Sequence, residues 1–494
     1  MQNGTLLAFI IGYMVITVWV GWLAGRRVKT AADFAVAGKQ LPLFMAACAL
    51  FATWFGSETV MGASARFVDE GVPGIIEDPF GAALCLVLAG LLVAKPLYKR
   101  NLLTFSDFFR IRFSKTTEVV SALFMVPSFF SWIAAQLVAL AIILETVSGL
   151  DRMWGVLICT GLVLLYTYVG GLWAVAVTDV IQTLVILVGL VILAVILVGE
   201  VGGLDALIKS TPVDKPDFFR FFPKSNPISW IEWVAAWMTI GLGSIPQQDV
   251  FQRVMSARTE RASVTACYVA AFMYLTVAFI PLIISYSGSI LHPELAVGDK
   301  QGLIPTMVLK YHGLGTQILF FGALMSAILS TASGAMLAPA TVIGENLVKK
   351  LYKKELTDAQ LLRIMRLSLV GVAIFTGGMA VWRNDIYELV SESSAFSLVS
   401  LFVPLIAGLY WDRANNIGAI TSMVTGFSAW IIALWILPGS GNVSDDSSFA
   451  SILLSIPAML WGFMASILGM VIGTLVGSNL IRRRRNRILR EKMV

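Results

Sequence analysis

The sequence predicts an all-α integral membrane protein with about 13 transmembrane helices, arranged as a five-plus-five inverted repeat with two broken helices. Composition is the first observation: the 494 residues are 57% hydrophobic and 13% charged. That leaves too few polar residues to cover the surface of a soluble fold of this length. The apolar residues also gather in long runs, and two of those runs are interrupted at corresponding places along the chain.

Apolar runs of about 18 residues or more are long enough to cross a membrane as helices. The runs cover residues 5–25, 41–66, 74–97, 118–147, 152–170, 174–199, 228–250, 262–290, 314–345, 362–382, 385–411, 416–437 and 454–478. The first run has no basic start and no small-residue cleavage site, so we interpret it as an anchor helix and not as a signal peptide.

The second run is interrupted at residues 52–56 and the seventh at residues 241–246. Five spans separate the two interruptions, and an odd number gives the two halves opposite topology. Interrupted helices at matching positions indicate an inverted repeat with a binding site at the membrane midplane. We therefore predict one transport domain, 1–494, whose parts are an extra helix at 5–25, repeats at 41–199 and 228–411, two extra helices at 416–478 and a basic cytoplasmic tail at 479–494.

Loop charges predict the orientation. With the N-terminus outside and the C-terminus cytoplasmic, Lys and Arg favour the cytoplasmic loops by about three to one. The net charge of +6 then reflects loops that face anionic lipid and not a nucleic-acid surface. We expect a multi-pass protein of the plasma (cytoplasmic) membrane, in a bacterial inner membrane. Gln252 and Arg253 are interpreted as the cytoplasmic end cap of the seventh span.

Several function classes are not indicated. Cys48, Cys85, Cys159 and Cys267 lie in apolar runs without a CxxC pair, so we expect buried packing residues. Two histidines without spaced acidic ligands argue against a transition-metal site. The chain contains no GxxxxGK[ST] loop and no recognisable Ser/His/Asp set. We therefore expect a protein that is not an enzyme and has no organic cofactor.

A cation site is predicted where the first interruption meets the ninth run. Unwinding near Ala52 leaves carbonyl oxygens without helical partners, and such oxygens can bind a small cation. Ala327, Ser330 and Thr331 are spaced i, i+3, i+4 and so share one helix face. A neutral cage of oxygens suits Na⁺. The alternative is that both hydroxyls bond to their own helix or join two helices.

Four acids lie inside or beside apolar runs. Glu58 follows the first interruption, where a central acidic residue costs roughly 2.5 to 3.5 kcal/mol and indicates a binding site. Asp179 is either a cation gate or a partly hydrated acid near the interface. Glu77 and Asp78 open the third run, either as cavity residues or as caps of a helix start. Adjacent residues do not share a helix face, so at most one of this pair is expected to face a cavity.

Aromatic and amide side chains supply candidate walls for a substrate site. The faces of Trp54, Trp132 and Trp237 could attract a cationic group, and the alternative for these residues is an interfacial belt. Gln247 and Gln248 follow the second interruption. Their amides could bind a polar substrate or the backbone groups freed there.

Several spaced motifs resemble the sodium:solute symporter family over roughly residues 5–440. They are ADFAVAG at 32–38, VGGLWAV at 169–175, TDVIQ at 178–182 and the Gln252–Arg253 pair. Within the family the chain is most similar to the high-affinity choline transporters, through residues 52–54, 94–96, 166–167, 245–246 and 251–253.

The resemblance implies the five-plus-five fold and a sodium site. Its ligands would be the carbonyls of Ala52, Phe55 and Ala327 and the hydroxyls of Ser330 and Thr331. Asp179 matches an acid that is associated in the family with gating or with a further sodium.

The resemblance is incomplete at the substrate. Trp54 and Trp132 match an aromatic cage of the choline branch, whereas Gln247 and Ala82 replace two of its aromatic residues. This chain adds the acids described above. The predicted substrate-binding residues are Trp54, Glu58, Glu77, Asp78, Trp132, Gln247 and Gln248.

We therefore predict a secondary active symporter that couples inward Na⁺ flux to uptake of a small polar organic solute by alternating access. A cationic or zwitterionic solute, such as a choline-like amine, is favoured. The alternatives are a Na⁺-coupled amino-acid (proline-like) or sugar symporter, a transporter-like membrane sensor and a passive channel. Sensors of this family usually carry a cytoplasmic kinase extension, which is not expected here. The expected partners are the solute, Na⁺ and the lipid bilayer, with no nucleic acid.

Overall fold

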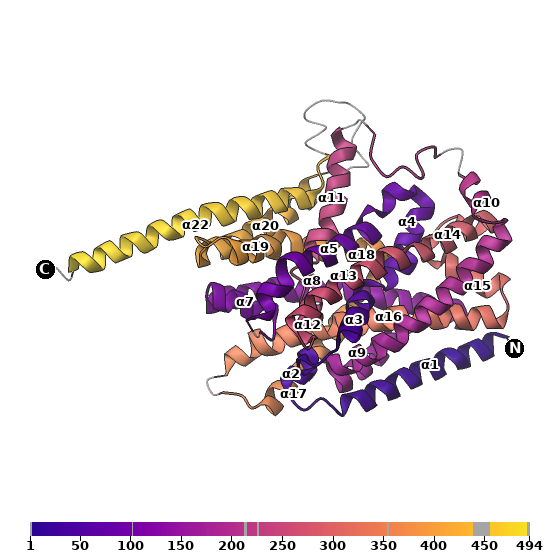
Figure 1. Ribbon diagram of the computed structural model, residues 1–494, viewed down its shortest axis with the longest axis horizontal. Helices are drawn as coiled ribbons and strands as arrows, with labels where there is room; N and C mark the ends of the chain where they lie inside the picture. Colours follow the sequence, from indigo (N-terminus) through magenta and orange to yellow (C-terminus); the bar gives the residue numbers. More distant parts are fainter. Residues whose placement is uncertain are drawn as a thin grey trace.

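The computed structural model describes residues 2–100, 102–211, 215–224, 227–352, 355–437 and 455–491. The described residues form helices joined by short connections, and they contain no β-strand. One isolated parallel bridge pairs Leu41 with Ala257. Most of the long helices run side by side along the long axis of the molecule (Figure 1).

The helices of the first half lie before residue 227, and short 3-10 or π segments are labelled η. Their bounds are α1 (Gln2–Gly25), α2 (Ala31–Val36), η1 (Ala37–Lys39), α3 (Leu43–Trp54), η2 (Glu58–Gly62), α4 (Ala63–Glu70), η3 (Val72–Ile75), η4 (Ile76–Gly81), α5 (Ala82–Leu88), η5 (Ala89–Ala94), α6 (Lys95–Tyr98), α7 (Phe105–Arg112), α8 (Lys115–Ser148), α9 (Arg152–Val201) and α10 (Leu204–Lys209).

The remaining helices follow in the same order along the bundle. Their bounds are α11 (Pro227–Gly243), α12 (Gln248–Ser256), α13 (Glu260–Val277), α14 (Phe279–Leu291), η6 (Pro293–Ala296), η7 (Lys300–Gly302), α15 (Leu303–Tyr311), α16 (Leu314–Val342), η8 (Ile343–Val348), η9 (Lys349–Leu351), α17 (Asp358–Trp382), α18 (Ile386–Ser397), η10 (Leu398–Phe402), α19 (Val403–Tyr410), α20 (Asn416–Ile436) and α22 (Ala458–Glu491).

The number of spans agrees with the sequence prediction. Within the described residues, ten helical segments are long and apolar enough to cross a membrane, and two further pairs qualify together although each is bent by 50°. The 50-residue helix α9 contains two predicted runs, joined at Gly171 with φ +50° and ψ −157°. Glycine adopts that conformation without the steric cost that a Cβ atom would bring. Counting α9 as two spans gives the predicted thirteen.

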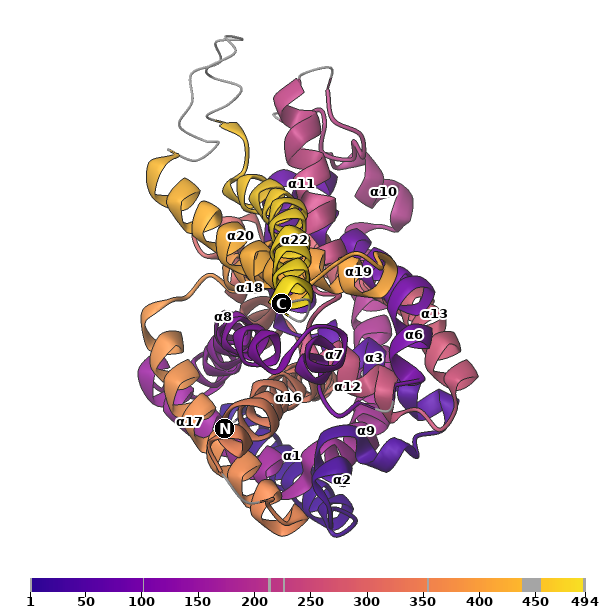
Figure 2. The ribbon, with the colours of Figure 1, turned by 90° about the vertical axis from the view of Figure 1, so that its left-hand side faces the viewer.

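Helix α16 forms the centre of the bundle. It packs against α8, α9, α17 and α3, and Figure 2 shows it ringed by other helices when the bundle is viewed end-on. Helix α1 lies along α9, whereas α20 and α22 pack against each other at the periphery (Figure 1). Polar residues in the middle of α16 therefore face protein and not lipid.

The two bent pairs are α3 with α4 and α11 with α12, at the interruptions predicted from the sequence. In the first break Phe55 has φ −75° and ψ 72°, and the Gly56 N–H donates to the Trp54 carbonyl at 2.8 Å. These are the features of an inverse γ-turn. In the second break Pro246, which has no N–H to continue a helix, precedes the extended residue Gln247.

The C-terminal helix extends beyond the predicted last span. Helix α22 continues to Glu491 and so includes most of the predicted basic tail. The four cysteines are buried and free, as expected for packing residues. The division of the chain into two repeats stays a prediction.

Candidate functional site

A small buried cavity lies where the two helix breaks meet. Trp54 and Glu58 line it from the first break, and Ser244 and Gln247 line it from the second. Its remaining walls are Asp78, Ala82, Trp132, Ile240, Tyr274, Val390 and Ser394. The cavity has a volume of about 10 Å³, which is room for about one water molecule. We call it the central cavity.

A much larger cavity of about 880 Å³ lies on the side of the 215–224 loop. Arg66, Glu70, Glu77 and Tyr387 contribute to its walls, and Ser391 does so from α18. Ser394, which lines the central cavity, lies about one helical turn further along α18. This outer cavity therefore leads from the 215–224 loop towards the central cavity.

Glu58 is held in the central cavity by a glutamine. Its side chain is 3% exposed, and Gln136 Nε2 donates to Glu58 Oε2 at 2.7 Å. Gln136 Oε1 accepts in turn from the Ser57 N–H at 3.0 Å. The second carboxylate oxygen, Oε1, has no hydrogen-bond partner among the described residues. One oxygen is thus fixed by the protein and the other is available to a ligand.

Asp78 has a similar arrangement on the opposite helix. Tyr274 donates from its hydroxyl to Asp78 Oδ1 at 2.6 Å, and the same hydroxyl lies 2.6 Å from Thr59 Oγ1. Asp78 is 1% exposed. Its Oδ2 atom has no partner in the described part of the chain. The cavity therefore holds two carboxylates that are each half satisfied.

Glu77 lies in the outer cavity, where Ser391 Oγ donates to its Oε1 at 3.4 Å. The expectation that at most one of Glu77 and Asp78 faces a cavity is wrong, because each of them lines a different one. The reason is local: Asp78 has extended backbone angles, φ −139° and ψ 118°, so the helix-face argument does not apply to this pair.

The predicted sodium residues meet at the end of α3. Ser330 Oγ and Thr331 Oγ1 both donate to the Ala52 carbonyl, at 3.3 and 3.0 Å. Thr331 also bonds to the carbonyl of Ala327 at 3.2 Å. The two hydroxyls therefore bridge α16 to the first break, and both alternatives considered from the sequence, bonding within α16 and joining two helices, occur together.

The Ala52 carbonyl is available because the break redirects its helical partner. Gly56 N–H bonds to Trp54 instead of Ala52, and Ser57 N–H bonds to Gln136. A Cβ atom on Gly56 would lie 2.6 Å from Thr331 Oγ1. Only glycine lets α16 approach the break this closely.

Asp179 joins this oxygen cluster directly. Ser330 Oγ donates to Asp179 Oδ1 at 2.5 Å, and the aspartate is fully buried. Its Oδ2 atom has no hydrogen-bond partner among the described residues. The interpretation of Asp179 as a partly hydrated interfacial acid is therefore wrong.

Three other residues lie away from the places expected of them. Gln248 bonds to the backbone of Leu103 and Phe105 and does not line the central cavity, so its predicted substrate role is wrong. Trp237 packs against an aromatic cluster with Phe80 instead of forming a cavity wall.

Arg253 is not an exposed end cap. It is 1% exposed, and its Nε donates to the Ala49 carbonyl of α3 at 2.9 Å. It lies close enough to Asp179 and Asp249 to interact electrostatically with both. The buried guanidinium therefore connects the second broken helix to the first.

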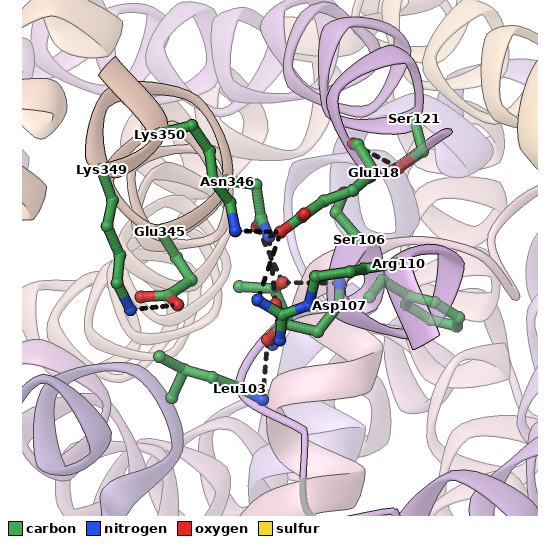
Figure 3. Close-up of polar contacts among 12 residues, drawn as sticks. Leu103, Ser106, Asp107, Arg110, Glu118, Ser121, Glu345, Asn346, Lys349 and Lys350 are labelled. Carbon is green, nitrogen blue, oxygen red and sulfur yellow. Dashed lines mark hydrogen bonds and ion pairs between the residues drawn. The ribbon is translucent and has the colours of Figure 1, made fainter. Parts of the chain in front are cut away.

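A polar network closes the opposite end of the bundle from the outer cavity (Figure 3). Asn346 donates to Glu118 Oε1 at 2.8 Å and to Asp107 Oδ1 at 3.2 Å. Lys350 and Arg110 supply positive charge to Glu118, at 3.1 and 3.8 Å. We call these five residues the inner network. It joins α7, α8 and the segment that continues α16.

The sequence analysis missed Gln136 and Tyr274, although both contact a cavity carboxylate. Each is a lone polar side chain inside a long apolar run, which is a sign of function in a membrane span. Their partners lie 78 and 196 residues away along the chain. That separation is why local spacing could not identify the pairs.

Comparison with known proteins places the chain. A model of the sodium:solute symporter family matches residues 34–426.

This chain belongs to the sodium:solute symporter family.

Two curated relatives of this symporter cover most of its length. Human high affinity choline transporter 1 is 26% identical over 443 residues, which cover 85% of this chain and 75% of that protein. The osmoregulated proline transporter OpuE of Bacillus subtilis is 27% identical over 448 residues, covering 86% and 88%. The names of these relatives therefore include both a quaternary amine and an amino acid.

The fold is shared with a solved symporter. The substrate-bound, outward-open structure of a Na⁺-coupled sialic acid symporter matches with a TM-score of 0.78 at 21% identity, covering 96% of this chain and 98% of that one. The predicted fold class and the prediction of a sodium:solute symporter are confirmed at this level.

Proposed function

We propose that this symporter uses the inward movement of Na⁺ to take up a small organic cation or zwitterion through the central cavity. The observation that carries the proposal is that both helix breaks line one buried cavity, with the Ala52–Ser330–Thr331 oxygen cluster at the end of the first break. Irregular backbone at membrane depth is tolerated where it lines a site, and freed carbonyls there coordinate cations.

The sodium ion would be held by neutral oxygens. The carbonyls of Ala52, Phe55 and Ala327 and the hydroxyls of Ser330 and Thr331 are the proposed ligands. Three of these groups already contact Ala52 or one another in the structure. A cation between them would join α3 to α16, so that its binding stabilises one arrangement of the two helices.

The solute would enter through the outer cavity and leave on the side of the inner network. The first is wide, about 880 Å³, and the central cavity is almost closed, about 10 Å³. The inner network ties three helical segments on the other side. Alternating access would then require the outer cavity to narrow and the inner network to separate.

The proposed orientation places the N-terminus outside and the inner network in the cytoplasm. The inner network includes Arg110 and Lys350, in agreement with the positive charge expected of cytoplasmic loops. The proposed location is the cytoplasmic membrane of a bacterium.

A thermal-shift screen tests the binding step. The purified protein is heated with amines, amino acids and sugars, in Na⁺ buffer and in K⁺ buffer. We expect a solute that raises the melting temperature in Na⁺ and much less in K⁺, because the ion and the solute bind the same arrangement. Equal stabilisation in both salts would contradict sodium coupling.

A further inference from the structure

Three hydrogen-bond acceptors in the central cavity have no partner among the described residues. They are Oε1 of Glu58, Oδ2 of Asp78 and Oε1 of Gln247. All three side chains are at most 3% exposed and all line the cavity. Buried polar atoms are almost always satisfied by protein, water or ligand. The cavity is therefore arranged to accept hydrogen bonds from a bound molecule.

The charge of the cavity is negative. Of the described residues that line it, two are carboxylates and none is Lys, Arg or His. The groups that anchor the carboxylates are the neutral amide of Gln136 and the hydroxyl of Tyr274. Arg66 lies in the outer cavity and pairs with Glu70. Buried charges are stable when an opposite charge accompanies them, so the bound molecule should be a cation.

The aromatic walls do not decide which kind of cation binds. Trp54 and Trp132 line the cavity, and indole faces attract methylated and unmethylated ammonium groups alike. The carboxylates make the distinction. A quaternary ammonium has no N–H group, so it would leave all three acceptors buried without a hydrogen bond. A primary ammonium has three N–H donors, one for each acceptor.

We propose that the transported solute carries a primary or secondary ammonium group whose N–H donors bridge Glu58 and Asp78. This inference rests on the proposed function, because it concerns the solute of the same cavity. It separates this symporter from a carrier of quaternary amines, despite its similarity to choline transporters. The specificity would come from acceptors that only an N–H donor satisfies.

A methylation series tests the inference on the unmodified protein. Ethanolamine, N-methylethanolamine, N,N-dimethylethanolamine and choline each carry one positive charge near neutral pH, while their N–H donors fall from three to none. 1,4-Diaminobutane is added because two carboxylates can pair two charges. Affinity is measured from stabilisation of the purified protein in Na⁺. We expect ethanolamine or the diamine to bind at least about 100-fold more tightly than choline, since a site built for N–H donors rejects analogues without them.

Two variants locate the effect. Glu58→Gln and Asp78→Asn are each expected to weaken amine binding at least about tenfold, because each removes a charged acceptor. Glu145→Gln is the matched control, since Glu145 pairs with Arg152 near the C-terminal end of α8. Its amine affinity should equal that of the unmodified protein.

Three outcomes would overturn the inference. They are an affinity that is flat or rises towards choline, the absence of stabilisation by every N–H amine, and unchanged amine binding in both cavity variants. Failure of the proposed function has a different signature, because no solute of any class would then show sodium-dependent stabilisation.

Discussion

Ser330 is the residue at which the proposed sodium site meets a buried acid. Its hydroxyl lies 3.3 Å from the Ala52 carbonyl and 2.5 Å from Asp179 Oδ1. One side chain therefore contacts both a backbone oxygen freed by the helix break and a carboxylate. Changes at Ser330, Thr331 and Asp179 should affect the ion before they affect the fold.

The double substitution Ser330→Ala with Thr331→Ala tests the ligands. It removes both side-chain oxygens from the cluster, and an unsatisfied buried group costs about 1–3 kcal/mol. We expect the apparent sodium affinity of uptake to fall at least about tenfold. Ser326→Ala is the control, because Ser326 bonds to Gly322 and Tyr13 elsewhere on α16. Unchanged sodium dependence in the double variant would remove the site assignment.

Asp179→Asn tests the role of the acid. The amide keeps the size of the side chain and can still accept from Ser330, but it loses the negative charge. If Asp179 passes a cation between states, the transport rate should fall by about tenfold, within the range typical of coupling between sites. The affinity for solute should change much less. Initial rates and binding curves are compared, and equal transport rates would show that the charge is not used.

The residue scale also shows what the sequence could give. Ala52, Ser330, Thr331 and Asp179 were identified because their spacing or their motif is local. Gln247 lines the central cavity whereas its neighbour Gln248 bonds to Leu103 and Phe105. That difference depends on the exact turn of the second break, which spacing does not reveal.

At the scale of single elements, the first broken helix depends on one close approach. Gly56 lies against α16 so tightly that a Cβ atom would be 2.6 Å from Thr331 Oγ1 and 2.8 Å from Gln136 Oε1. Those two atoms belong to the proposed sodium site and to the support of Glu58. The sequence predicted this break from its small residues, but not which side chains it would touch.

Gly56→Ala should therefore impair both ligands. The methyl group would push α16 away from the break, so we expect sodium and solute affinity to fall together, by about tenfold or more. Gly315→Ala is the matched control on α16, because no atom lies within 4 Å of the position its Cβ would take. Both affinities are measured by thermal shift. A normal response in Gly56→Ala would contradict the close approach.

The inner network makes a separate prediction about stability. Asn346→Asp replaces the donor that separates Glu118 from Asp107 with a third carboxylate. Breaking a buried ionic arrangement costs about 3–5 kcal/mol, so the variant should unfold at a clearly lower temperature. Asn384→Asp, at an exposed position, should leave the melting temperature unchanged. Equal melting temperatures for the two variants would show that the network does not hold the bundle together.

For the whole molecule, the sequence predicted the number of spans and both breaks, because these follow from hydropathy and from small polar residues within it. It did not predict that Arg253 would be buried between broken helices, or that Gln136 and Tyr274 would anchor the cavity acids. Those facts depend on which helices become neighbours. The same packing leaves the outer cavity wide and the central cavity nearly closed.

Concentrative uptake into proteoliposomes tests the central claim most directly. The amine found by the screen is supplied outside vesicles that contain the purified protein, with Na⁺ outside only, with equal Na⁺ on both sides, or with K⁺ in its place. The account predicts that solute accumulates above its external concentration only with the inward Na⁺ gradient, and that a sodium ionophore abolishes the accumulation. Equal uptake in the three conditions, or uptake that never exceeds the external concentration, would contradict it.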